Sequence, residues 1–229
     1  MNKLIIANWK NHPETLEEAK ELFEFEVAEA LKYPNIKTII CPPEHFLKSL
    51  IEINREFVGA QDVFWEPGAD NYQVKFALVG HSDRRKAGET DEIVNQKLKQ
   101  ALIEGVVSVL LVGEKKREDD SKMVLEEQLS KCLAGLSATD AARVLIAYEP
   151  VWAISTNPNA EPDEPENTLI AAEVIKQVTG KESILYGGSV NQNNVENFLK
   201  HPEISGAVIG GASLRKEEFA NILKVASEL

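Results

Sequence analysis

The sequence predicts an α/β protein of the (β/α)8 barrel class, folded as a single domain over residues 1–229. Short apolar runs alternate with longer amphipathic stretches along the whole chain, and no linker-like Gly, Ser or Pro segment divides it. Eight such runs in 229 residues leave about 29 residues for each strand–helix unit. That spacing is close to the size of one βαβ repeat, so eight repeats favour a closed barrel.

The apolar runs are rich in β-branched residues and almost continuously hydrophobic, which indicates parallel strands buried on both faces. The predicted strands are residues 4–7, 38–41, 57–60, 76–79, 106–112, 144–148, 183–186 and 207–209. The predicted helices, with apolar residues at helical spacing, are residues 15–32, 91–104, 122–134, 166–178 and 217–226. The first strand leads into Asn8-Trp9-Lys10 rather than a glycine-rich turn, which argues against an open dinucleotide-binding sheet.

Composition and charge exclude several classes of protein. Hydrophobic residues make up 43% and charged residues 27% of the chain, as in ordinary soluble globular proteins. The net charge of −12 disfavours nucleic acid and anionic lipid as partners. No apolar run reaches the roughly 18 residues of a membrane span, and the N-terminal apolar stretch is too short for a signal peptide. The two cysteines do not have the spacing of a metal site. We therefore expect a cytoplasmic protein with no membrane or nucleic-acid partner and no bound metal.

Glycine pairs follow the last two predicted strands. Gly187-Gly188 precedes Ser189, and Gly210-Gly211 precedes Ala212-Ser213, where a short helix is expected to begin. Backbone N–H groups in such turns can bind an anion at the carboxyl edge of a barrel. One pair alone would indicate only a tight turn. Two pairs at corresponding positions favour a phosphate site.

Three ionisable residues lie just beyond other predicted strands: Lys10, His81 and Glu149. Taken singly, Lys10 is typical of a solvent-exposed lysine, His81 of a buried histidine whose hydrogen bonds are all made within the core, and Glu149 of a surface carboxylate. A barrel, however, directs all three strand ends to one cavity. A carboxylate that abstracts a carbon-bound proton, with an imidazole and an ammonium group that stabilise the resulting oxyanion, forms a set for proton transfer beside a carbonyl.

Five motifs, in this order and spread over essentially the whole chain, resemble the triosephosphate isomerase family. They are Asn8-Trp9-Lys10, Gly80-His81-Ser82-Asp83-Arg84-Arg85, Tyr148-Glu149-Pro150-Val151-Trp152-Ala153-Ile154, Tyr186-Gly187-Gly188-Ser189-Val190-Asn191 and Gly210-Gly211-Ala212-Ser213-Leu214. The resemblance implies a TIM barrel that interconverts dihydroxyacetone phosphate and D-glyceraldehyde 3-phosphate through an enediol(ate), in glycolysis and gluconeogenesis, without cofactor or metal.

The resemblance also implies a role for each matching residue. Glu149 matches the general base, His81 the electrophile that acts in this family as a neutral imidazole, Lys10 the cation that neutralises substrate charge, and Asn8 the neighbour that places the carbonyl oxygen. The residues that match phosphate-binding positions are Ser155, Ser189, Gly210 and Gly211. Residues 150–152 match the first hinge of a closing lid, a known feature of this family.

Departures from the family pattern qualify these roles. Ser155 and Asn157 stand where the family usually has glycine; we expect Asn157 to keep a left-handed turn and the lid, residues 150–160, to be mobile when empty. Asp83 replaces the usual glutamate, so this supporting carboxylate should reach Lys10 less well. Leu111 replaces a non-catalytic cysteine, which should affect only packing.

The loop at residues 62–72 is shorter than the family's and lacks the Thr-Gly-Glu tip that reaches into the partner subunit. Phe64, Trp65 and Phe46 are expected to be exposed, and exposed aromatics are commoner at an interface than on bare surface. We therefore expect a homodimer with a reduced interface; a monomer is the alternative.

Two other functions were weighed against the isomerase. A catalytically impaired barrel that only binds a phosphate compound would be signalled by the loss of Glu149, His81 or Lys10, and all three are present. Barrel enzymes acting on indole-glycerol phosphate or ribulose phosphate lack the combination of Asn-x-Lys with Glu-Pro-Val-Trp. The isomerase of small triose phosphates is therefore the leading hypothesis.

Overall fold

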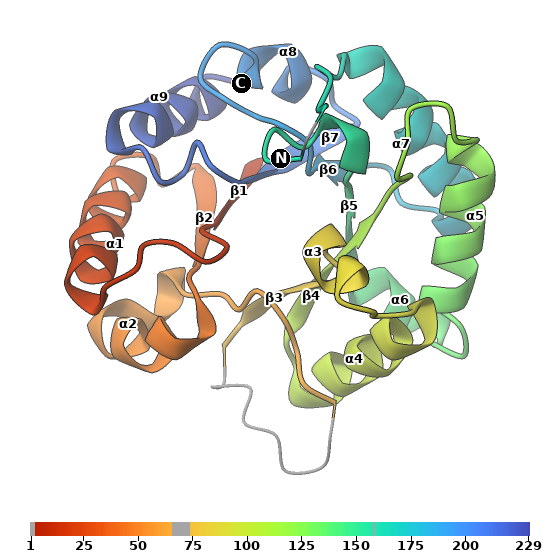
Figure 1. Cartoon of the computed structure of the whole chain (residues 1–229), viewed down its shortest axis with the longest axis horizontal. Coiled ribbons are helices and arrows are strands. Elements are labelled where there is room, and N and C mark those ends of the chain that lie inside the picture. The colour runs from red at the N-terminus through yellow and green to blue at the C-terminus, as the bar shows by residue number, and fades with distance from the viewer. Residues whose placement is uncertain (1–2, 66–73, 158) are drawn as a thin grey trace.

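The computed structural model describes residues 3–65, 74–157 and 159–229. The strands occupy the centre of the molecule, and the helices surround them as an outer ring (Figure 1). Seven strands form one parallel sheet in the order β2-β1-β7-β6-β5-β4-β3. They are β1 (Lys3–Asn8), β2 (Ile36–Cys41), β3 (Phe76–Val79), β4 (Val107–Val112), β5 (Leu145–Tyr148), β6 (Ile184–Tyr186) and β7 (Ile204–Ile209). This arrangement confirms the predicted (β/α)8 barrel class.

Helices occupy most of the connections between the strands. The α-helices of the described residues are α1 (Leu16–Ala30), α2 (Leu47–Asn54), α3 (Ser82–Lys86), α4 (Asp91–Glu104), α5 (Ser121–Cys132), α6 (Ala138–Arg143), α7 (Pro165–Thr179), α8 (Val195–Leu199) and α9 (Lys216–Ser227). Three 3₁₀ turns are η1 (Glu44–Phe46), η2 (Arg55–Phe57) and η3 (Val151–Ala153). Within the described ranges, no helix combines the length and apolar character needed to cross a membrane.

The barrel closes between β2 and β3 through the chain segment that connects them. Val58 forms a parallel bridge to Ile40 of β2, and Ala60 forms a parallel bridge to Ala77 of β3. The Ala60 N–H donates to the Phe76 carbonyl at 2.9 Å, and the Leu78 N–H donates back to the Ala60 carbonyl at 2.9 Å. These few bonds complete the ring that the seven longer strands leave open.

The predicted strand at residues 57–60 is therefore wrong in detail, because the segment forms two single bridges rather than a continuous strand. Phe57 belongs to η2, which leaves three residues for the connection. At the central one, Gly59, an added Cβ would lie 2.6 Å from Ile39 Cγ2, so the backbone runs too close to β2 for a regular side chain. The four short helices α2, α3, α6 and α8 were not predicted, because five to eight residues give too few turns for a clear apolar period.

Successive residues of each strand alternate between two hydrophobic layers. The outer layer packs against the helices, and the inner layer fills the centre of the barrel. Leu111 belongs to the inner layer and is fully buried, so its effect is on packing, as expected. The inner layer consists of Ile6, Ile39, Cys41, Leu78, Val109, Leu111, Ala147, Leu185 and Val208.

Glu26, on the inner face of α1, is a fully buried carboxyl group in the outer layer. The Trp9 indole N–H lies 3.1 Å from Oε1 and 3.2 Å from Oε2 of Glu26. Burial raises the pKa of Glu26 well above its ordinary value, and the Trp9 hydrogen bond offsets only part of this effect. The folded chain therefore binds a proton here that the unfolded chain releases near the ordinary glutamate pKa.

Glu26→Gln is predicted to stabilise the fold at pH 8. Because the folded-state pKa is raised, the free energy of unfolding of the parent falls as pH rises above the ordinary glutamate pKa, whereas glutamine keeps the acceptor for Trp9 without this loss. We expect a gain on the order of 1 kcal/mol, or about 2–4 °C in melting temperature, that shrinks toward zero at pH 4. The exposed Glu24→Gln on the same helix is the control. An unchanged or lower melting temperature for Glu26→Gln at pH 8 would contradict the prediction.

Candidate active site

The carboxyl ends of the strands meet at one edge of the barrel, around a cavity of about 210 Å³. This cavity collects eight of the nine residues that the sequence predicted for the site. They are Asn8, Lys10, His81, Glu149, Ser155, Ser189, Gly210 and Gly211. The ninth, Asp83, lines an adjoining cavity of about 430 Å³, which shares Asn8, Lys10 and His81 with the first. The closed sheet thus brings together residues that are up to 203 positions apart in the sequence, from Asn8 to Gly211.

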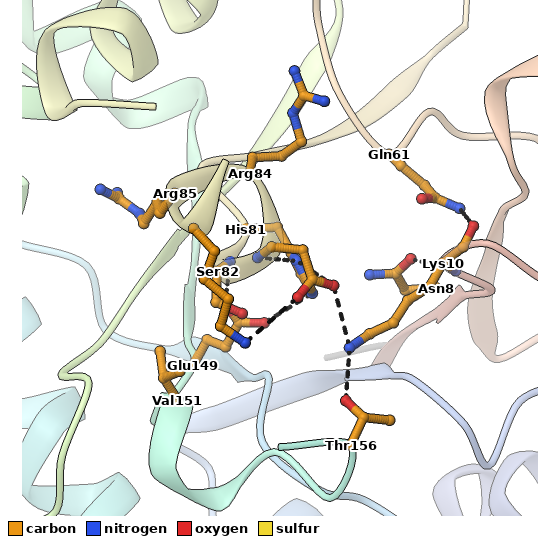
Figure 2. Close-up of polar contacts among 12 residues, drawn as sticks. Asn8, Lys10, Gln61, His81, Ser82, Arg84, Arg85, Glu149, Val151 and Thr156 are labelled. Atoms are coloured by element: carbon orange, nitrogen blue, oxygen red, sulfur yellow. Dashed lines mark hydrogen bonds and ion pairs between the residues drawn. The ribbon is translucent and has the colours of Figure 1, made fainter. Parts of the chain in front are cut away.

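Glu149 directly follows β5 and is buried, with 4% of its surface exposed. Its Oε1 lies 3.0 Å from His81 Nε2, and its Oε2 accepts the Ser82 backbone N–H at 2.8 Å (Figure 2). Each carboxylate oxygen therefore accepts a hydrogen bond from the segment that follows β3. This arrangement fixes the carboxylate against the imidazole and keeps water away from it.

The hydrogen bonds of His81 identify its protonation state. His81 caps the N-terminus of α3, and the Asp83 backbone N–H donates to His81 Nδ1 at 3.1 Å. A nitrogen that accepts a hydrogen bond carries no proton, so the Nε2 that faces Glu149 is the protonated nitrogen. The imidazole is therefore neutral and presents one N–H donor to the cavity.

Two glycines on neighbouring strands enclose the backbone of Glu149. An added Cβ at Gly113, after β4, would lie 2.1 Å from the Glu149 carbonyl oxygen. An added Cβ at Gly187, after β6, would lie 3.3 Å from Glu149 Cβ. The backbone is also held by hydrogen bonds on both sides, from the Glu149 N–H to the Val112 carbonyl and from the Gly187 N–H to the Tyr148 carbonyl, each at 2.7 Å. The position of the carboxylate thus depends on two residues that have no side chain.

Lys10 has a left-handed backbone conformation, with φ of 53°, which is uncommon for a residue other than glycine. The Asn8 side-chain oxygen accepts the Lys10 N–H at 3.1 Å, and Gln61 Nε2 donates to the Lys10 carbonyl at 2.7 Å (Figure 2). Sequence analysis missed Gln61, whose only signal was its place directly after the apolar run at residues 57–60. These two amides hold the lysine backbone in its strained turn.

The Lys10 amine contacts two residues at the mouth of the cavity. It lies 3.4 Å from Asp83 Oδ2 and donates to Thr156 Oγ1 at 3.2 Å. The shorter side chain of Asp83 thus still reaches Lys10, at the distance of an ion pair rather than of a close hydrogen bond. Burial acts to raise the pKa of Asp83, but the nearby positive charges, above all that of Lys10, hold it below its usual value. Asp83 therefore remains ionised beside the lysine.

The expected phosphate end of the cavity is lined by both glycine turns and by the lid. The Ser155 N–H donates to Ser189 Oγ at 2.7 Å, and this hydroxyl donates to the Ala153 carbonyl at 2.7 Å. Residues 211–214 form a turn rather than the expected short helix, and α9 begins only at residue 216. Arg215, which sequence analysis missed although it directly follows the last motif, lines the cavity and donates to the Gly211 carbonyl at 2.9 Å.

The expected lid spans residues 150–160, of which Pro158 lies outside the described residues. The left-handed conformation occurs at Asn159, with φ of 62°, and not at Asn157, so the expectation for Asn157 was wrong. Asn157 acts through its side chain instead. Its Nδ2 donates to the Val151 carbonyl at 2.6 Å, and its Oδ1 accepts from the Lys86 amine at 2.6 Å. These two bonds connect the tip of the lid to its hinge and to α3.

The expected cluster of exposed aromatics is only partly present. Phe46, the last residue of η1, is 6% exposed and belongs to the hydrophobic core, so this expectation was wrong. Phe64 and Trp65 are half-buried, and the Lys97 amine lies 5.6 Å from the centre of the Trp65 ring. The rest of the short loop, at residues 66–72, lies outside the described residues.

Comparison with known proteins gives one consistent result. A family model described as triosephosphate isomerase matches residues 3–226. The triosephosphate isomerase of Dehalococcoides mccartyi is 36% identical over 251 aligned residues, which cover 99% of this chain and 98% of the relative. That of Carboxydothermus hydrogenoformans is 37% identical over 250 residues, covering 98% and 99%, and that of Dictyoglomus thermophilum is 34% identical over 246 residues, covering 97% and 98%. The similarity therefore extends along the whole chain and is not confined to the strand-end motifs.

Asn157→Ala is predicted to loosen the lid without unfolding the barrel. The change removes two side-chain hydrogen bonds, each worth about 0.5–1.5 kcal/mol. Hydrogen–deuterium exchange of peptides covering residues 150–160 should accelerate about threefold to tenfold. The exposed Asn197→Ala on α8, whose side chain makes neither contact, is the control. Unchanged exchange in the lid would show that these bonds do not hold it.

Proposed function

The chain belongs to the triosephosphate isomerase family, and on this premise we propose that it interconverts dihydroxyacetone phosphate and D-glyceraldehyde 3-phosphate by proton transfer through an enediol(ate). The observation that carries the proposal is the convergence of the Glu149 carboxylate, the neutral His81 imidazole and the Lys10 amine on one cavity of about 210 Å³. We further propose that residues 1–229 act as one catalytic domain, in the glycolysis and gluconeogenesis of the cytoplasm.

Glu149 acts as the base in the proposed reaction. Both of its oxygens are engaged, by His81 Nε2 and by the Ser82 N–H, so one bond must be released before the carboxylate can approach a carbon-bound proton. Because the group is buried, little water must be displaced when it turns toward the substrate. The same carboxyl group then returns the proton to the neighbouring carbon, and a positioned base of this kind contributes about 10²–10⁴ to the rate.

Three groups stabilise the oxyanion that develops as the proton leaves. The neutral His81 presents its Nε2–H, Asn8 places an amide beside the cavity, and the Lys10 amine brings a positive charge. A neutral imidazole suits this task, because its Nε2–H hydrogen bond to the oxygen strengthens as negative charge develops there. The oxygen of the substrate would thus take over the hydrogen bond that His81 now gives to Glu149.

The phosphate group is proposed to bind at the opposite end of the cavity. Ser155, Ser189, Gly210 and Gly211 line that end, and the Lys10 amine supplies the charge. The Ser155 N–H now donates to Ser189 Oγ, so this bond must be released before the N–H can bind the phosphate. Local dipoles and a single lysine can hold a dianion even in a chain of net charge −12, because the cavity shields them from the acidic outer surface. A catalytically impaired, binding-only barrel is not favoured, since all three ionisable groups are present and converge.

We also propose a homodimer with a reduced interface, since triosephosphate isomerases are generally dimeric and the loop at residues 62–72 is short. The cavity of about 430 Å³ beside Lys10 and His81, which Phe64 helps to line, is the proposed contact face. A partner covering this face would exclude water from the outer side of both catalytic groups. The backbone of Lys10 is already held by Asn8 and Gln61 of its own chain, so a small interface suffices.

Glu149→Gln is predicted to reduce kcat by about 10²–10⁴, because it removes the base but keeps the shape of the side chain and one of its two acceptor oxygens. Binding of a phosphate-bearing substrate analogue and the melting temperature should change little. A coupled assay that follows glyceraldehyde 3-phosphate measures the effect, with the exposed Glu196→Gln as the control. A near-normal kcat for Glu149→Gln would exclude Glu149 as the base.

The reduced interface is predicted to dissociate on dilution into the nanomolar-to-micromolar range. Sedimentation velocity should show the change in mass, and the specific activity should fall over the same range as the catalytic groups become open to water. A single monomer mass at high protein concentration, with full activity, would overturn the proposed dimer.

A further inference from the structure

The two runs of three consecutive basic residues in the sequence, Arg84-Arg85-Lys86 and Lys115-Lys116-Arg117, meet in space. Arg85 and Lys86 of the first run and all three residues of the second line one cavity of about 590 Å³. We call this cavity the basic pocket. The chain has 25 basic residues in 229 positions, and five of them line this one cavity.

Whereas the whole chain has a net negative charge, the lining of the basic pocket has a net positive charge. Five of its residues are basic, and two, Glu118 and Glu161, are acidic, whereas the chain as a whole carries −12. A cleft lined by one sign of charge concentrates the field and attracts the opposite ion. The basic pocket therefore favours an anion although the protein surface generally repels one.

Two of the basic residues are already engaged in ion pairs. Arg85 Nη1 lies 2.6 Å from Asp91 Oδ1, and Arg117 Nη1 lies 2.7 Å from Glu161 Oε2. The Arg117–Glu161 pair connects two residues of the pocket lining, whereas Arg85 pairs with a residue outside it. Because both arginines are paired, the lysines are the groups that can bind a ligand.

The three lysines are much less neutralised. Lys86 donates to the uncharged Asn157 amide and lies 3.7 Å from its nearest carboxylate oxygen, on Asp83. Lys115 and Lys116 form no ion pair with any carboxylate in the described part of the chain. Three exposed amines around one cavity match a ligand with several adjacent negative charges, such as a chain of phosphates.

The basic pocket is separate from the catalytic cavity. The two share no lining residue, and the expected lid lies between them: residues 154–156 line the catalytic cavity, and Val151, Trp152 and Asn157 line the basic pocket. The basic pocket is also larger, at about 590 Å³ against 210 Å³, and Trp152 gives it an apolar wall. It therefore suits a ligand bigger than a triose phosphate.

We propose that the basic pocket is a second anion site, which binds a small molecule bearing a polyphosphate group. Because the Lys86 amine also holds the Asn157 side chain, a bound polyphosphate competes for that amine and alters the lid. The ligand should therefore act on turnover by way of the lid rather than by occupying the place of the substrate.

Calorimetric titration with inorganic tripolyphosphate, at an ionic strength fixed with sodium chloride, tests the proposal. One site per chain is expected, and Lys115→Ala/Lys116→Ala should weaken binding at least tenfold. The control is Lys20→Ala/Lys224→Ala, which removes the same charge from exposed positions on α1 and α9 and should change binding less than twofold. A second arm with magnesium-free ATP distinguishes a nucleotide from inorganic polyphosphate, since only the nucleotide adds an apolar body for Trp152.

Steady-state kinetics with tripolyphosphate separate the two cavities. A change in kcat that disappears in Lys115→Ala/Lys116→Ala supports the basic pocket, with near-parental basal activity showing that this variant is folded. Purely competitive inhibition of equal strength in all three proteins would place the ion in the catalytic cavity and overturn the proposal. Absence of binding, or equal weakening in both double variants, would also overturn it.

Discussion

The catalytic arrangement depends on the closure of the parallel sheet by residues 58–60. These residues form one bridge to β2 and one to β3, and without them the sheet would be open between those strands. An open, twisted sheet would separate the end of β1, which carries Asn8, from the end of β3, which leads to His81. The closing segment also continues directly into Gln61, which donates to the carbonyls of Lys10 and Cys41. The bonds that complete the barrel thus run on into those that shape the active site.

Local geometry, rather than net charge, suits the candidate site to an anion. Lys10 is paired with Asp83 at 3.4 Å, so its charge is partly balanced before a substrate binds. Backbone N–H groups and a neutral imidazole add positive electrostatic potential without adding a full charge. Such fixed dipoles are effective because they are already oriented toward the cavity before a ligand binds. The acidic outer surface therefore does not prevent the protein from handling phosphates.

Strand positions and strand-end residues could be predicted because each depends on a short stretch of sequence. A buried parallel strand shows itself as a continuous apolar run, and the residue that follows it lies at the catalytic edge, as Glu149 and His81 do. Residues whose role depends on contacts with distant parts of the chain could not be predicted in this way. Gln61 is identified only by its contact with Lys10, 51 positions away. The left-handed turn at Asn159 rather than Asn157, and the burial of Phe46, likewise depend on how loops pack in space.

The two glycines beside Glu149 divide the cavity into a part that can be redesigned and a part that cannot. At Gly113 even a methyl group would collide with the backbone of Glu149, and at Gly187 there is little more room. Randomised libraries at these positions would therefore yield mostly inactive barrels, although neither residue takes part in the chemistry. The glycine turn after β7 has no such restriction, since an added Cβ at Gly210 or Gly211 meets nothing closer than 3.9 Å. Directed evolution toward larger sugar phosphates should thus succeed at the turn after β7, while the surroundings of Glu149 stay as they are.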